Sequence, residues 1–224
     1  MPIDSRPLPS FIASSSQEGI PYGRFAETLT EEFAKGVERI EDLPEGVEMP
    51  AKLDWFPERR WGGRVWMPVT GRTSGDGEAI ELFGHVSYRQ EGEGDPEDFR
   101  TMADFTDVLA EDNPDWNIDL NDDVIGEWRG ENDRAGDVTL VWGRPLMQGA
   151  AAVTAQLETA TADQAPITDG RFTLIALDAL KAYGDDVFME IKLWNRRSQE
   201  LASESLYAEE EPDPEPSDSE PASA

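Results

Sequence analysis

Short segments of strand-like residues, separated by turns rich in glycine, aspartate and asparagine, recur along most of this chain. Two of them, near residues 65–69 and 80–88, alternate apolar and polar side chains around the turn 71–77. Strands that recur roughly every 10 to 20 residues are typical of a β-sandwich or barrel. We therefore predict a mainly β fold of about eight strands. The later strands are predicted at 124–129, 138–142, 151–157, 172–177, 187–194 and 201–207.

Two other segments repeat their apolar residues at steps of three and four, which is the spacing of one helix face. The first predicts a helix near residues 24–41, and the second predicts a helix near 96–111. In the second segment Asp95 is a candidate N-cap and Pro96 the first helical residue. The apolar residues of the two faces are Phe25, Leu29, Phe33, Val37 and Ile40, then Phe99, Met102, Phe105 and Leu109.

The two ends of the chain differ in composition from the middle. Residues 1–21 are rich in proline and serine, so we predict an extended arm. Residues 22–208 are expected to form one β-rich domain, and 209–224 a disordered acidic tail. We see neither an export signal nor an apolar run of the roughly 18 residues that a membrane-spanning helix needs.

Acidic residues greatly outnumber basic ones, with 48 Asp and Glu against 19 Lys and Arg. Forty-one of the acids precede residue 209, so the excess belongs to the folded body. A net charge of −29 repels phosphate backbones, which argues against direct nucleic-acid binding. Molar salt would screen the self-repulsion, since the Debye length falls to about 3 Å at 1 M. We therefore predict a halophilic protein; the alternative is an acidic protein of a GC-rich bacterium.

The amino-acid composition excludes several classes of catalytic site. Without cysteine it has no disulfide, thiolate nucleophile or thiolate zinc site, and His85 is its single histidine. His85 is predicted to face solvent or a partner, and no nucleophile motif accompanies it. Some carboxylate pair is expected by chance among 48 acids. We predict a protein that is not an enzyme and has no cofactor; catalysis through acidic pairs or His85 is the least supported alternative.

One acidic segment resembles part of a calcium-binding loop. However, Leu120 stands where the loop needs glycine, and Gly126 where it needs glutamate. A polar strand face or loop is therefore the favoured interpretation, with weak cation binding as the alternative. The candidate ligands are Asp115, Asn117, Asp119, Asn121 and Asp123.

Tryptophan and arginine are enriched at protein interfaces, and seven tryptophans are many for a chain of 224 residues. Two arginine pairs also stand out in so acidic a sequence, and each could bind carboxylates of a neighbouring subunit. Core filling by tryptophan and solvated arginines in turns are the plain alternatives. The interface candidates are Arg59, Arg60, Trp61, Trp66, Trp128, Arg196 and Arg197.

With its acidic, lysine-poor, cysteine-free composition, extended arm, strand pattern over 64–207 and acidic tail, the chain resembles the smaller major capsid proteins of tailless icosahedral haloarchaeal viruses. The resemblance implies a single jelly-roll fold and a virion location. It implies assembly with copies of itself and a second capsid protein, in a shell over an internal membrane. It implies no active site.

A second hypothesis is a cytoplasmic β-sandwich module that binds a carbohydrate or a partner protein through Trp61, Trp66 and Trp128. It predicts a monomer with an exposed aromatic patch.

Overall fold

The computed structural model of the chain describes residues 13–75, 77–92, 94–129, 135–157, 160–178 and 189–206. Within these ranges it has one α-helix, one short 3-10 helix and twelve strands, all paired antiparallel. The predicted mainly β class is confirmed, although the strands number more than the expected eight. No helix in the described ranges is long and apolar enough to cross a membrane.

The strands form three sheets. The helix-covered sheet has the order β1-β3-β4-β5, with β2 also paired to β3, and contains β1 (Asp54–Trp55), β2 (Arg59–Trp61), β3 (Arg64–Gly75), β4 (Glu78–Arg89) and β5 (Glu97–Thr106). The middle sheet has the order β10-β7-β6 and contains β6 (Ile118–Arg129), β7 (Ala135–Pro145) and β10 (Phe172–Asp178). The outer sheet has the order β12-β11-β8-β9 and contains β8 (Ala150–Leu157), β9 (Ala160–Pro166), β11 (Met189–Asn195) and β12 (Glu200–Ser205).

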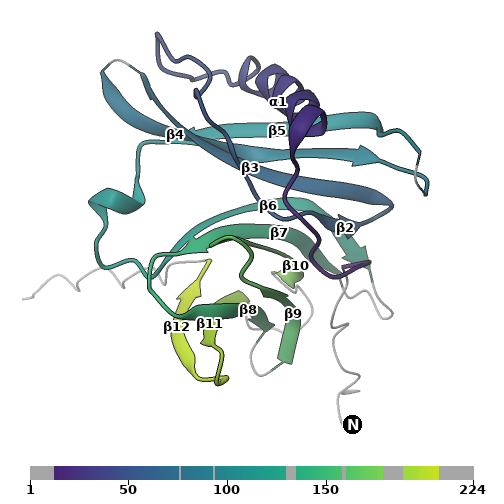
Figure 1. Cartoon of the computed structure of the whole chain (residues 1–224), viewed down its shortest axis with the longest axis vertical. Helices are drawn as coiled ribbons and strands as arrows, with labels where there is room; N and C mark the ends of the chain where they lie inside the picture. The colour runs from purple at the N-terminus through teal and green to yellow at the C-terminus, as the bar shows by residue number, and fades with distance from the viewer. Residues whose placement is uncertain are drawn as a thin grey trace, which may run out of the picture.

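The helix α1 (Gly23–Val37) and the three sheets stack as four layers, with α1 at the top of Figure 1 and the outer sheet at the bottom. One hydrophobic core lies between α1 and the helix-covered sheet. A larger core joins the middle and outer sheets and takes in side chains of the helix-covered sheet. The middle sheet is therefore covered on both faces.

That double covering explains the sequence of two strands of the middle sheet. In β7 the five residues Val138–Trp142 are all buried, and in β10 the six residues Phe172–Leu177 are buried. A strand with cover on both faces cannot alternate apolar and polar residues, so it appears as a nearly continuous apolar run.

The first predicted helix is present but shorter than the expected range 24–41. It ends at Val37 because Arg39 N–H and Ile40 N–H donate to the carbonyls of Gly36 and Val37, which closes the helix with a tight turn. Gly36 lies against the sheet so closely that a Cβ there would come within 2.4 Å of Thr101 Cγ2.

The second predicted helix, 96–111, is wrong. Residues 97–106 form the strand β5, and only Ala110–Asp112 make a 3-10 helix, η1. Phe99 and Phe105 are an even number of residues apart, so they share a strand face, which packs towards α1, while Met102 faces the other core. The spacing of these apolar residues fits both a helix and a strand. Hydrogen bonding to the edge of β4 makes the segment a strand.

The jelly-roll arrangement is not confirmed. A jelly roll places eight strands in two sheets, whereas the described strands form three sheets. Most hydrogen-bonded neighbours also follow one another directly in sequence, as in β3-β4-β5 and β11-β12.

Candidate functional site

A polar layer lies between the helix-covered sheet and the middle sheet. Along β4, Ile80, Leu82 and Val86 face α1, so the alternate side chains face the middle sheet. Two of these alternate residues, Glu81 and His85, are buried there although both are polar. Charged side chains of β6 and β7 meet them from the other side.

His85 bridges the two sheets. Its Nε2 lies 2.8 Å from Asp123 Oδ2 on β6, and its ring makes an edge-on contact with Trp66, the centroids being 5.1 Å apart. The residue is 5% exposed, so the prediction that it faces solvent or a partner is wrong. The predicted alternation placed His85 on the correct face, but that face is covered by a second sheet.

Glu81 belongs to a chain of charges within the same layer. Arg72 Nε donates to Glu81 Oε2 over 2.9 Å, and Arg72 Nη1 pairs with Glu111. Burial raises the pKa of Glu81, Asp119 adds to this rise, and Arg72 and Arg144 oppose it. Burial also raises the pKa of Asp119, with Arg144 and Arg72 opposing.

Two arginines share one carboxylate at the end of this layer. Arg144 Nη2 lies 3.1 Å from Asp54 Oδ2, Arg171 Nη2 lies 2.9 Å from Asp54 Oδ1, and both guanidinium groups lie over the ring of Phe56. Burial would raise the pKa of Asp54, but Lys52, Arg144 and Arg171 outweigh it, so the pKa is lowered. The charged groups of the layer thus pair mainly with one another, although Arg144 Nε and His85 Nδ1 have no hydrogen-bond partner among the described residues.

The five candidate cation ligands do not form a loop around an ion. Four of them lie on or next to β6, where alternate residues are about 7 Å apart along the strand. Asp123 binds His85 instead, and Asn117 Nδ2 donates to Glu204 at 3.4 Å. Within the described ranges, no group of three or more His, Asp and Glu side chains is placed to hold a metal ion.

The three candidate tryptophans lie in or against the larger core. Trp66 is buried and its Nε1 donates to the Trp61 carbonyl over 3.1 Å. Trp61 packs on Gly126, where a Cβ would come within 2.4 Å of the indole, and Trp128 is partly buried against the core. These side chains join the helix-covered and middle sheets and do not form an exposed aromatic patch.

The first arginine pair is engaged within the chain. Arg59 of β2 forms a buried ion pair with Asp163 of β9. Arg60 pairs with Glu58 at 2.6 Å and lies 3.8 Å from Glu18. Burial raises the pKa of Asp163, while Arg59 and the backbone N–H of Ile175 and Gln164 lower it.

Part of the predicted arm, from residue 13 onwards, lies beside β2, with a bend over residues 13–15 and no regular element up to residue 22. Ser14 N–H donates to the Arg60 carbonyl, Glu18 N–H to the Glu58 carbonyl, and Glu58 N–H to the Gly19 carbonyl. Residues 1–12 and the predicted tail lie outside the described residues. A cavity of about 310 Å³ beside the arm is lined by Ala13, Ser15, Ser16, Arg59, Asp163 and Gln164.

Gln17 attaches the arm to the edge of β10. Its Nε2 donates to the Pro166 carbonyl and to Thr168 Oγ1, each over 3.0 Å, and its Oε1 accepts from Thr173 N–H over 2.9 Å. Ile175 N–H donates to Asp163 Oδ2 over 2.8 Å. Two N–H groups on the edge of β10 that faces away from β7 are therefore bound by side chains of the arm and of β9.

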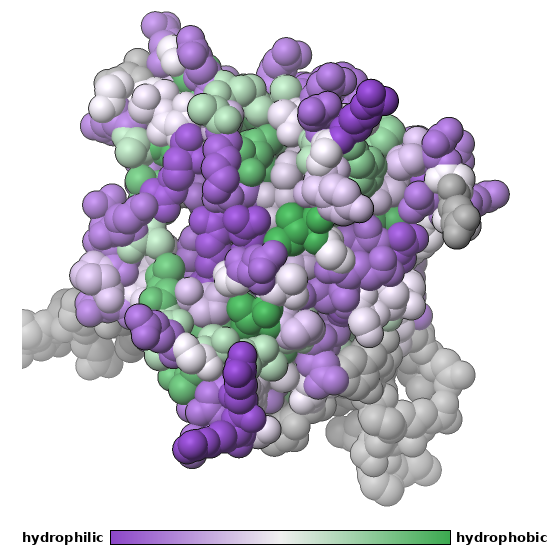
Figure 2. Space-filling view, viewed as in Figure 1, coloured by the Kyte–Doolittle hydropathy of each residue, from purple (hydrophilic) through white to green (hydrophobic). Residues whose placement is uncertain are grey.

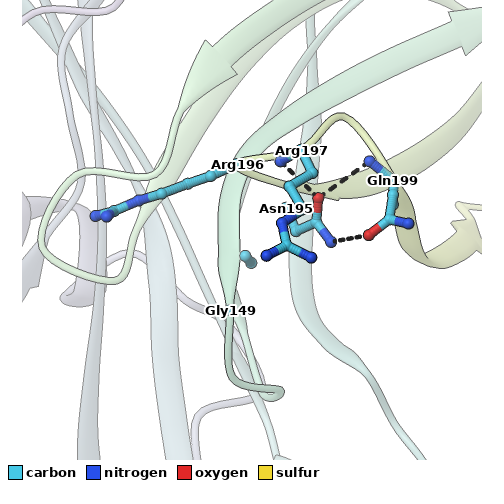
Figure 3. Close-up of a pocket in the computed structure, with 6 residues that line it drawn as sticks. Gly149, Asn195, Arg196, Arg197 and Gln199 are labelled. Atoms are coloured by element: carbon cyan, nitrogen blue, oxygen red, sulfur yellow. Dashed lines mark hydrogen bonds between the residues drawn. The ribbon is translucent and has the colours of Figure 1, made fainter.

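The second arginine pair lies on the exposed turn between β11 and β12. Arg196 and Arg197 line a shallow pocket of about 370 Å³ together with Asn195, Gln199 and the segment 149–150 (Figure 3). In the part of the chain that the structure describes, neither guanidinium has an ion-pair partner. Of the seven interface candidates, these two remain available to a binding partner.

Several residues that connect the sheets and the arm could not be identified from the sequence. Gln17, Asp54, Asp163 and Arg171 have no local motif, and each has a partner more than 100 residues away in the sequence. Asp163 of β9 can be recognised as a paired residue only when the strand that supplies its partner is known.

Comparison with known proteins gives no relative. No protein-family model matches the chain, and neither a curated protein nor a solved structure matches it significantly.

Proposed function

We propose that this chain is a structural subunit that assembles with copies of itself, as the capsid protein of a halophilic virus. The observation that carries the proposal is the arm. It is held by three backbone hydrogen bonds to Glu58 and Arg60, at and just before β2, and by Gln17 at β10. Because every copy offers the same partners to an arm, neighbouring copies can exchange their arms, which is a low-cost route to assembly.

The closed interior supports a structural role. Charged side chains of the polar layer pair with one another, as Arg144 and Arg171 do with Asp54. Within the described ranges, His85 contacts Asp123 and Trp66, and no nucleophilic side chain is hydrogen-bonded to it. The described residues therefore offer no nucleophile that His85 could activate, whereas a rigid stack of sheets can form the same contact in every copy of a subunit.

The acidic surface fits the same proposal. Hydrophilic side chains cover most of the face in Figure 2, and hydrophobic ones form small separate patches. With a net charge of −29, copies would approach only where salt screens the repulsion. The single jelly roll predicted over residues 64–207 stays part of the proposal, although the described strands form three sheets rather than two. A second capsid protein and an internal membrane are the neighbours that the proposal implies.

Light scattering on the full chain in molar salt tests the proposal. A discrete oligomer or particle, with a mass that is a fixed multiple of 24.9 kDa, is the expected result. A monomer at every accessible concentration would argue for a different role.

The alternative, a cytoplasmic binding module, has one observation in its favour: the pocket at the turn 195–199. Its tryptophan site loses support, because Trp66 is buried and Trp61 packs on Gly126. A monomer that binds a carbohydrate or protein, and loses that binding in the double variant Arg196→Gln and Arg197→Gln, would favour this alternative.

A further inference from the structure

The turn between β11 and β12 is a rigid support for two arginines. Asn195 Oδ1 accepts from Arg197 N–H and Gln199 N–H over 2.8 and 3.1 Å, and Asn195 Nδ2 donates to Gln199 Oε1 over 3.0 Å (Figure 3). Asn195 N–H also donates to the Gln199 carbonyl. The backbone of the turn is thus ordered independently of the arginine side chains.

Unpaired arginines are few in the part of the chain that the structure describes. Within the described ranges only four basic side chains lack an ion-pair partner: Arg24, Arg39, Arg196 and Arg197. Arg24 and Arg39 lie at opposite ends of α1, whereas Arg196 and Arg197 are adjacent and line one pocket. The turn is therefore a local positive site on a strongly acidic molecule.

The geometry points to a contact between this turn and the acidic C-terminal segment 209–224 of the same molecule. That segment, EEEPDPEPSDSEPASA, holds seven acids and no base. Guanidinium groups bind carboxylates through paired, planar hydrogen bonds, and two adjacent ones can hold two carboxylates of an extended segment. The contact does not depend on the proposed assembly.

The connection is long enough. β12 runs antiparallel to β11 and pairs Ser205 with Glu190, so the chain leaves β12 at the end opposite the turn, about 17 Å away. From Leu206 to Asp213 an extended chain spans up to about 25 Å. The acids from Asp213 onwards can therefore reach the turn, and the attachment keeps their local concentration near the millimolar range.

Paramagnetic relaxation in NMR spectra tests the contact on the full chain. Because the protein has no cysteine, Ser217→Cys provides a single site for a nitroxide label in the tail. The experiment uses the lowest salt concentration at which the circular dichroism spectrum is unchanged. We expect the label to broaden the amide signals of Ser198 and Gln199.

Two double variants of equal net charge distinguish binding by Arg196 and Arg197 from a general effect of charge. Arg196→Gln with Arg197→Gln should lower the ratio of bound to free tail by about 2- to 30-fold, the range for two exposed ion pairs. Arg24→Gln with Arg39→Gln changes the net charge equally and should leave the broadening intact. No broadening at the turn, or equal loss in both variants, would overturn the inference.

A mixing experiment identifies the molecule that supplies the tail. Isotope-labelled protein without nitroxide is mixed with unlabelled protein that carries it. The inference predicts no broadening in this mixture, whereas broadening at Ser198 and Gln199 would show that the tail comes from a second copy and would refute the contact within one molecule.

Discussion

Arg59 of β2 and Asp163 of β9 form a buried ion pair that connects all three sheets. Arg59 belongs to the helix-covered sheet and Asp163 to the outer sheet, and Asp163 also accepts a hydrogen bond from Ile175 N–H of the middle sheet. A single carboxylate thus fixes the relative position of three layers that are separate in their backbone hydrogen bonding.

Removal of one partner of this pair should be strongly destabilising. Asp163→Leu leaves the Arg59 charge buried and the Ile175 N–H without an acceptor, so we expect the free energy of unfolding to fall by about 3–5 kcal/mol. Urea unfolding in molar salt measures it. Glu127→Leu, which removes an exposed partner of Arg129, is the control and should cost under about 1 kcal/mol. Equal losses in the two variants would contradict this role of Asp163.

Gln17→Ala should loosen the arm. The substitution leaves the buried Thr173 N–H without its acceptor, which costs about 1–3 kcal/mol. Faster hydrogen exchange at Thr173 and faster proteolysis within residues 13–22 are the expected results. Ser16→Ala, whose hydroxyl makes no hydrogen bond in the described structure, should change neither rate. Unchanged exchange at Thr173 in the Gln17 variant would show that Gln17 does not hold the arm.

Asp119→Asn should stabilise the protein near pH 7. Because burial raises the pKa of Asp119 in the folded state, the folded protein binds this proton more tightly than the unfolded chain does. The contribution of Asp119 to stability is therefore favourable at low pH and decreases as pH rises through its folded-state pKa.

The gain from Asp119→Asn should accordingly shrink as the pH is lowered from 7 towards 4, as measured by urea unfolding across that range. Asp115→Asn, at an exposed loop position, is the matched control for the loss of one negative charge. A gain from Asp119→Asn that is constant across the range would contradict the effect of burial.

The melting temperature should rise with salt concentration. Repulsion among the acids of the body extends over about 10 Å at 0.1 M salt and about 3 Å at 1 M. Calorimetry in sodium chloride should therefore show a higher melting temperature at 1 M than at 0.1 M. The same melting temperature at both concentrations would contradict the halophilic interpretation.

The spacing of apolar residues predicted an element correctly where that spacing fits only one type of secondary structure. The helix face with Leu29 and Phe33 has a period that only a helix explains, and α1 is present. The segment with Phe99 and Phe105 fits both a helix and a strand, and its neighbour β4 decided the outcome. A periodic pattern thus shows which side chains share a face more reliably than it shows which structure covers that face.

The candidate sites depend on contacts between residues that are far apart in the sequence. The alternation of β4 placed His85 on the face opposite Val86, but the presence of β6 against that face was not visible in the sequence. Arg59 and Arg196 each begin an arginine pair in the sequence, yet only Arg59 has an acid of a distant strand beside it. Residues paired over 100 positions apart carry no local signal of their pairing.

The most direct test of the proposed assembly is the mass of the full chain as salt is lowered from molar to millimolar, measured by light scattering together with circular dichroism. A subunit of the proposed kind should form discrete oligomers or particles in molar salt that dissociate as repulsion among the acids becomes unscreened. A folded monomer whose mass is the same at every salt concentration would contradict it.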